Sequence, residues 1–103
     1  AMSPLGLGVK LPKIRRTILE TAAKLITGDR EREHGDALEN FELVAAYWSA
    51  HLNIKITATD VPTMMELFKI ARRKSGLYHQ DNYVDAAGYA ALSYEIACET
   101  KKK

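Results

Sequence analysis

Residues 66–92 read ELFKIARRKSGLYHQDNYVDAAGYAAL, and this stretch decides the fold because it holds two helical patterns with a stop between them. Gly76 ends the first pattern, since glycine favours the position that follows a helix. Residues 77–80 leave room for only a tight connection before a second helix that begins near Asp81. Helices joined by so short a link pack in opposite directions. The sequence therefore predicts an antiparallel helical hairpin.

Helical patterns continue on the N-terminal side of this hairpin. Gly28 stops a first helix, Asp36 can cap a second, and Thr59 or Asp60 can cap the third, which is the first half of the hairpin. The four predicted helices cover about residues 13–27, 37–52, 60–75 and 81–99. Their core positions, chosen by helical spacing, are Ile14, Ile18, Ala22, Leu25, Ile26, Leu38, Phe41, Val44, Ala45, Trp48, Leu52, Val61, Met64, Met65, Phe68, Ala71, Val84, Ala87, Gly88, Ala91, Cys98 and either Tyr94 or Glu95.

Four helices with short links favour an all-α fold, a four-helix antiparallel bundle. We expect one helical domain over residues 13–100. Residues 1–12 contain Pro4, Gly6, Gly8 and Pro12, which indicates an irregular arm whose first two residues look like a tag remnant. A chain of 103 residues buries a modest share of its surface, so we also expect a homo-oligomer.

Composition excludes several classes of protein. The 47% hydrophobic and 27% charged residues are typical of a globular protein, and no apolar run approaches the roughly 20 residues that cross a bilayer. A net charge of +2 gives little reason to expect a nucleic-acid partner. Without a signal-peptide pattern we expect a cytoplasmic protein that has no membrane partner.

Ionisable residues gather on the facing sides of the predicted hairpin. Glu66, Lys69 and Arg73 are three or four residues apart and share one face of the third helix, with Arg72 beside them. Asp81 and Asp85 share one face of the fourth helix. The short turn between the helices should bring the two faces together.

Two chemical interpretations of this cluster remain open. Glu66, Asp81 and Asp85 are suitable oxygen ligands for Mg²⁺ or Mn²⁺. Lys69, Arg72 and Arg73 could neutralise phosphates there, and we expect Lys69 and Arg72 to bind them. In the other interpretation, the same groups form interhelical salt bridges. Further candidates for contact with a ligand are Asn40, His79, Asn82 and Tyr89.

The chain resembles an uncharacterised family of short phage and prophage proteins over about residues 14–97. The resemblance is carried by REREHGD (30–36), NF (40–41), FKIARR (68–73), HQDNYVD (79–85) and AAGYAAL (86–92). More distantly, the hairpin is similar to phage nucleotide-modification-associated domains and to MazG-like, all-α nucleoside triphosphate pyrophosphohydrolases. That resemblance implies a MazG-like bundle, a nucleotide ligand and a magnesium site built from two acidic pairs, Glu-x-x-Glu and Glu-x-x-Asp.

Transferred to this sequence, Glu66 matches the first acid of the first pair and Asp85 matches the last acid of the second, so the resemblance implies that these two residues are the catalytic pair. Lys69 and Asn82 occupy the positions of the other two acids, which removes two negative charges from the site. Asp81 could replace one ligand, or the pair Glu39 and Glu42 could join the site instead.

Three functions follow from these residues. The first is a metal-dependent nucleoside triphosphate pyrophosphohydrolase. The second is a protein that binds or sequesters a nucleotide without metal chemistry, which Lys69 and Asn82 favour. The third is a helical protein-interaction module in which the charged hairpin forms salt bridges.

Overall fold

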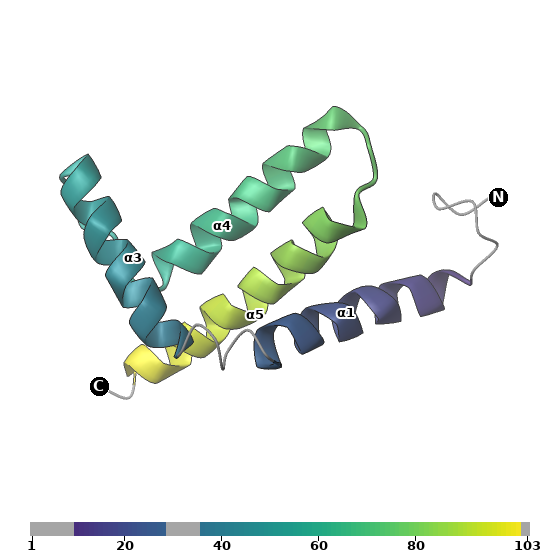
Figure 1. The fold of residues 1–103 in the computed structure, drawn as a ribbon, viewed down its shortest axis with the longest axis horizontal. Helices are drawn as coiled ribbons and strands as arrows, with labels where there is room; N and C mark the ends of the chain where they lie inside the picture. The colour runs from purple at the N-terminus through teal and green to yellow at the C-terminus, as the bar shows by residue number, and fades with distance from the viewer. Residues whose placement is uncertain (1–9, 29–35, 102–103) are drawn as a thin grey trace.

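A computed structural model of the chain describes residues 10–28 and 36–101, and these residues are all-helical with no strand among them (Figure 1). This confirms the predicted all-α class. The elements are α1 (Leu11–Thr27), α3 (Ala37–Leu52), α4 (Asp60–Ala71), the short 3₁₀ helix η1 (Arg72–Ser75) and α5 (Gln80–Lys101). The predicted irregular arm and tag remnant lie mostly outside the described residues. Helix α1 begins at Leu11, slightly earlier than predicted, because a helix accepts Pro12 in its first turn.

Local hydrogen bonds explain where the helices begin and end. The side chain of Asp36 accepts a hydrogen bond from the Leu38 N–H at 3.4 Å, as expected for the cap of α3. Helix α4 starts differently from the prediction, because the Thr57 N–H donates to Asp60 Oδ2 and the Asp60 N–H donates to Thr57 Oγ1, at 2.8 and 3.2 Å. Gly76 adopts a φ of +79°, a left-handed conformation that suits glycine and ends η1 where the sequence predicts the stop.

Helices α4 and α5 form the predicted antiparallel hairpin (Figure 1). Two contacts fix its register: the hydroxyls of Thr63 and Ser93 lie 3.0 Å apart, and Lys69 Nζ lies 2.9 Å from Asp85 Oδ2. The level of any other residue along the hairpin follows from these two pairs.

Helix α1 packs along α5 on the side away from α4, so α5 is the central helix (Figure 1). A Cβ atom added at Gly88 would lie 3.2 Å from Ile26 Cγ2, so α1 approaches α5 closely there. The two helices run in the same direction, which differs from the predicted fully antiparallel bundle. The short-link argument holds for the hairpin, but α1 and α5 are not consecutive helices, so no short link sets their relative direction.

Helix α3 touches the rest of the described structure near one end and leans away at the other (Figure 1). Leu38, Phe41 and Ala45 are its buried residues, and they form one cluster with Val61 of α4 and Ile96 of α5. Ser49 ties the link after α3 to the helix, because its hydroxyl accepts a hydrogen bond from the Ile56 N–H at 2.8 Å. Because α3 leans away, the described helices leave one side of the structure open.

The predicted core is correct in α3 near the cluster and incomplete in α5. Ala86 and Ile96 are buried although the single predicted stripe leaves them out, whereas Tyr94 is exposed. The reason is that α5 is covered on two sides, by α4 and by α1, so apolar spacing along one stripe does not describe it. Leu52 and Phe68 are also exposed, since α3 and α4 lack a neighbour on those faces. None of the described helices is long and apolar enough to span a membrane.

Candidate functional site

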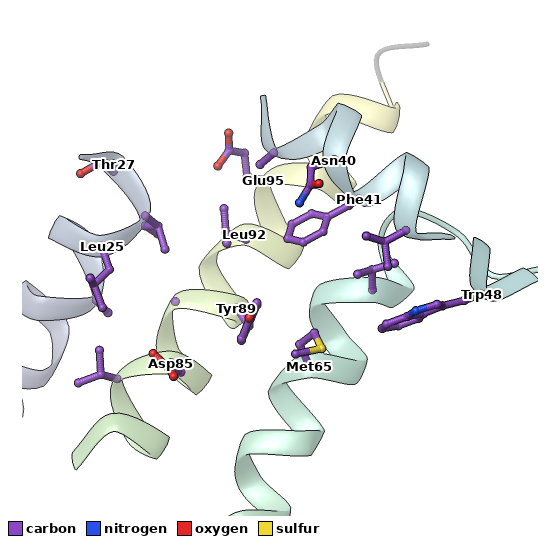
Figure 2. Close-up of a pocket in the computed structure, with 17 residues that line it drawn as sticks. Leu25, Thr27, Asn40, Phe41, Trp48, Met65, Asp85, Tyr89, Leu92 and Glu95 are labelled. Carbon is purple, nitrogen blue, oxygen red and sulfur yellow. The ribbon is translucent and has the colours of Figure 1, made fainter. Parts of the chain in front are cut away.

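A pocket of about 400 Å³ lies on the open side of the structure, over one face of α5 (Figure 2). We call it the α5 pocket. Helix α5 forms its floor, α1 and α4 lie on either side, and α3 closes one end. The lining residues are Ala22, Leu25, Ile26, Thr27, Ala37, Asn40, Phe41, Val44, Trp48, Val61, Met65, Val84, Asp85, Gly88, Tyr89, Leu92 and Glu95. A mainly apolar pocket with a few polar groups is the usual form of a small-molecule site.

Besides Thr27 of α1, whose hydroxyl donates to the Ala23 carbonyl, four polar side chains from two helices line this apolar pocket. Asn40 comes from α3, and Asp85, Tyr89 and Glu95 come from α5 (Figure 2). Asn40 offers both a donor and an acceptor, and the carboxylates of Asp85 and Glu95 offer acceptors. Three of the four, Asn40, Asp85 and Tyr89, are predicted site residues that the fold brings together.

Asp85 forms the central ion pair of the hairpin. Its Oδ2 lies 2.9 Å from Lys69 Nζ, with the Lys69 side chain 16% exposed and that of Asp85 31% exposed. The salt-bridge interpretation of the sequence is therefore confirmed for this pair. Because Asp85 also lines the α5 pocket, the pair sits between the pocket and the turn of the hairpin.

The three predicted metal ligands lie at different levels of the hairpin. Glu66 falls between the Thr63–Ser93 and Lys69–Asp85 pairs, and Asp81 falls on the other side of the second pair. Glu66 is three residues from Lys69 and Asp81 is four residues from Asp85, so at 1.5 Å per residue their levels differ by about 10 Å along the helix axes. Accordingly, no group of three or more His, Cys, Asp or Glu residues suited to a metal ion occurs within residues 10–28 and 36–101. The Mg²⁺ or Mn²⁺ cofactor stays a prediction.

The two neighbouring arginines differ in their surroundings. Arg72 is exposed, and its guanidinium carbon lies 5.7 Å from the centre of the Phe68 ring. Arg73 is half-buried, and its guanidinium carbon lies 4.1 Å from the centre of the Tyr83 ring. Of these two candidate phosphate ligands, Arg73 contacts the facing helix α5 through Tyr83, whereas Arg72 lies over Phe68 of α4. The phosphate role of Arg72 stays a prediction.

The remaining predicted contacts divide between the interior and the surface. Asn82 is a polar residue that is buried, with 6% of its surface exposed, whereas His79 and Asp81 are exposed. By helical spacing Asn82 shares the face of Asp85, three residues on. Glu39 and Glu42, the alternative acidic pair, are exposed on α3 and do not line the pocket.

Sequence reasoning missed Glu95 as a pocket residue and took Trp48 for a core residue. Trp48 is half-buried, packs on the core cluster and lines the α5 pocket. Neither assignment could be made from spacing, because both depend on how α3 leans across α5. Tyr94, on the exposed side of α5, has its pKa raised by a hydrogen bond with Cys98, and neither residue lines the pocket.

Comparison with known proteins gives a family and two phage relatives. A family model described as a domain of unknown function (DUF6378) matches residues 17–97. The Gene 55 protein of Mycobacterium phage L5 is 47% identical over 77 residues, which are 74% of this chain and 49% of that protein. The Gene 55 protein of Mycobacterium phage D29 is 45% identical over 80 residues, 78% of this chain and 53% of that protein.

The chain thus spans about half the length of the curated relatives that it matches. No solved structure matches it. The expected relationship to an uncharacterised phage family is confirmed by the family model and by both relatives.

Proposed function

The chain belongs to the DUF6378 family of phage proteins of unknown function, and from this premise we propose that it binds a nucleotide in the α5 pocket without requiring a metal ion. The observation that carries the proposal is the pocket itself. It combines apolar and aromatic walls with Asn40, Asp85 and Tyr89, and Lys69 lies at its edge through the ion pair with Asp85.

The walls of the pocket suit a nucleobase. Phe41 and Trp48 of α3 and Tyr89 of α5 are aromatic, and Met65 of α4 adds a polarisable thioether (Figure 2). Aromatic side chains can stack on the flat face of any nucleobase, whichever polar atoms lie along the edge of that base. The carboxamide of Asn40 can pair with one donor and one acceptor of such an edge, which would give selectivity among bases.

Charge favours direct binding of phosphate over binding through a metal. Lys69 neutralises Asp85 at 2.9 Å, so this carboxylate is already engaged by a cation. A magnesium ion at Asp85 would have to compete with the lysine. A phosphate next to Lys69 could instead leave this neutral pair in place and accept a hydrogen bond from one of the remaining N–H donors of the ammonium group.

Metal-dependent pyrophosphohydrolysis is the second candidate function, and Asp85 is the observation that favours it. Magnesium in phosphate sites is often held by one or two carboxylates and by the substrate itself. Asp85 lines the pocket, and half-buried Glu66 lies about 4.5 Å from its level along the hairpin axis. Hydrolysis at this place requires Lys69 to leave Asp85 when the metal enters.

Calorimetric titration with each of the four common deoxynucleoside triphosphates separates these functions. The proposal expects saturable binding in EDTA that magnesium changes little. Binding that depends on magnesium, together with release of pyrophosphate, would show that the protein is a pyrophosphohydrolase and would contradict metal-independent binding. If no nucleotide binds under either condition, both functions are wrong and the interaction module is the account left.

A further inference from the structure

Arg73 is the strongest feature of the described chain that the nucleotide pocket does not explain. Its Nε atom is buried and has no hydrogen-bond partner. A buried donor that lacks an acceptor costs about 1–3 kcal/mol, so such groups are rare in stable folds. Arg73 also makes no ion pair with any residue in the described ranges.

The contact with Tyr83 does not satisfy this donor. At 4.1 Å from the ring centre, the guanidinium stacks on the face of the ring, which is a cation–π arrangement. The face of the ring offers no oxygen or nitrogen acceptor, and Arg73 Nε has no hydrogen-bond partner. The ring therefore holds the guanidinium in place while its donors stay open to another acceptor.

The neighbours of Arg73 are suited to an anion. Arg73 lies four residues after Lys69, near the same face, and Asn82 lies three residues before Asp85 on the facing side of α5. In this set of four, Lys69 is neutralised by Asp85, whereas the charge of Arg73 is not balanced. The carboxamide of buried Asn82 can donate to an oxygen as well.

From these observations we infer that Arg73 and Asn82 form a phosphate-binding site at the turn end of the hairpin. The inference rests on the proposed nucleotide function and gives the ligand a direction. The base lies in the α5 pocket beside Tyr89, and the phosphates pass Lys69 towards Arg73, about one helical turn beyond Asp85. The fork of the guanidinium then pairs with phosphate oxygens.

Neighbouring Arg72 supplies a matched control, because it carries the same charge one residue earlier but is exposed above Phe68. The variants Arg73→Gln and Arg72→Gln are titrated with the deoxynucleoside triphosphate that the wild type binds and with its nucleoside. We expect Arg73→Gln to bind the triphosphate about 10- to 100-fold more weakly, since it loses charge-assisted hydrogen bonds. Its affinity for the nucleoside, and both affinities of Arg72→Gln, should stay at the wild-type level.

Equal triphosphate affinity of Arg73→Gln and the wild type overturns the inference, and so does an equal loss in Arg72→Gln. Circular dichroism checks folding, and Arg73→Lys serves as a second variant that keeps the charge but not the fork. Its triphosphate affinity should fall between the wild type and Arg73→Gln.

A second measurement tests the Arg73 site independently of nucleotide binding in the α5 pocket. If no nucleotide binds the wild type, the proposed function fails, and inorganic tripolyphosphate then probes the anion site alone. In ¹⁵N-labelled wild-type protein, the Nε–H resonance of Arg73 should shift saturably with tripolyphosphate while that of Arg72 stays in place. An unchanged Arg73 resonance overturns the inference.

Discussion

At the scale of single residues, the pair of Lys69 and Asp85 connects stability with function. The carboxylate lines the α5 pocket, while the ammonium group holds it from the other helix at 2.9 Å. The lysine makes this pair neutral, whereas a purely acidic site would be negative. The same contact therefore joins the hairpin and removes the repulsion that an isolated Asp85 would exert on a phosphate.

A double-mutant cycle measures this ion pair. Lys69→Met, Asp85→Asn and the double variant are unfolded in urea, and the pair's coupling is obtained from the four free energies of unfolding. With side chains 16% and 31% exposed, the pair lies between surface and buried cases, so we expect about 1 kcal/mol of coupling. Additive effects of the two substitutions would show that Lys69 and Asp85 do not interact in solution.

The two arginines show what could and could not be predicted for single residues. Helical spacing in the sequence already places Arg73 on the face of Lys69 and Arg72 beside it. The sequence predicts the phosphate role for Lys69 and Arg72, because spacing does not reveal which of the two guanidinium groups turns towards α5. Tyr83, at 4.1 Å from the Arg73 guanidinium, decides that question only in the folded hairpin.

At the scale of helices, the ends of the elements could be predicted almost completely. Asp36, Gly28 and Gly76 act locally, through hydrogen bonds and backbone conformation, and local rules identify them in the sequence. The neighbours of each helix are a different matter. Helix α5 is covered by both α4 and α1, and a prediction based on one apolar stripe misses Ala86 and Ile96.

Gly88 tests the packing of α1 on α5, which makes one wall of the pocket. A Cβ atom there would lie 3.2 Å from Ile26 Cγ2, so Gly88→Leu should overpack the contact and lower the free energy of unfolding by about 1–3 kcal/mol. Gly88→Ala is the control. Its gain in helix propensity, about 1 kcal/mol, should offset the mild crowding.

Urea denaturation of both variants gives these free energies. A Gly88→Leu protein as stable as the wild type would mean that α1 does not lie against α5 at this position.

At the scale of the whole molecule, the described helices form an elongated body with little core. The principal extents are 48 × 28 × 24 Å and the radius of gyration is 15.9 Å, against about 13 Å for a compact domain of this length. Met64, Leu67 and Phe68 form an apolar stripe on α4 and are 38%, 59% and 54% exposed. Exposed apolar stripes of this kind favour association.

We propose that the α4 stripe joins two copies of the chain, in line with the oligomer expected from its length. Sedimentation equilibrium should give a mass near twice the 11.5 kDa of one chain, and Leu67→Glu should lower the mass to that of a single chain. Leu19→Glu is the matched control, because Leu19 is 63% exposed on α1, away from the stripe. A monomeric wild type at high concentration would contradict the proposal.

The central claim is that the α5 pocket binds a nucleotide, and Trp48 reports on it directly. Trp48 is the only tryptophan of the chain and lines the pocket, so its fluorescence can be followed without labelling while a deoxynucleoside triphosphate is added in EDTA. We predict a saturable change in emission that Asn40→Ala weakens, with the same dissociation constant as the calorimetric titration. Emission that stays constant while the nucleotide reaches millimolar concentration would contradict binding in this pocket.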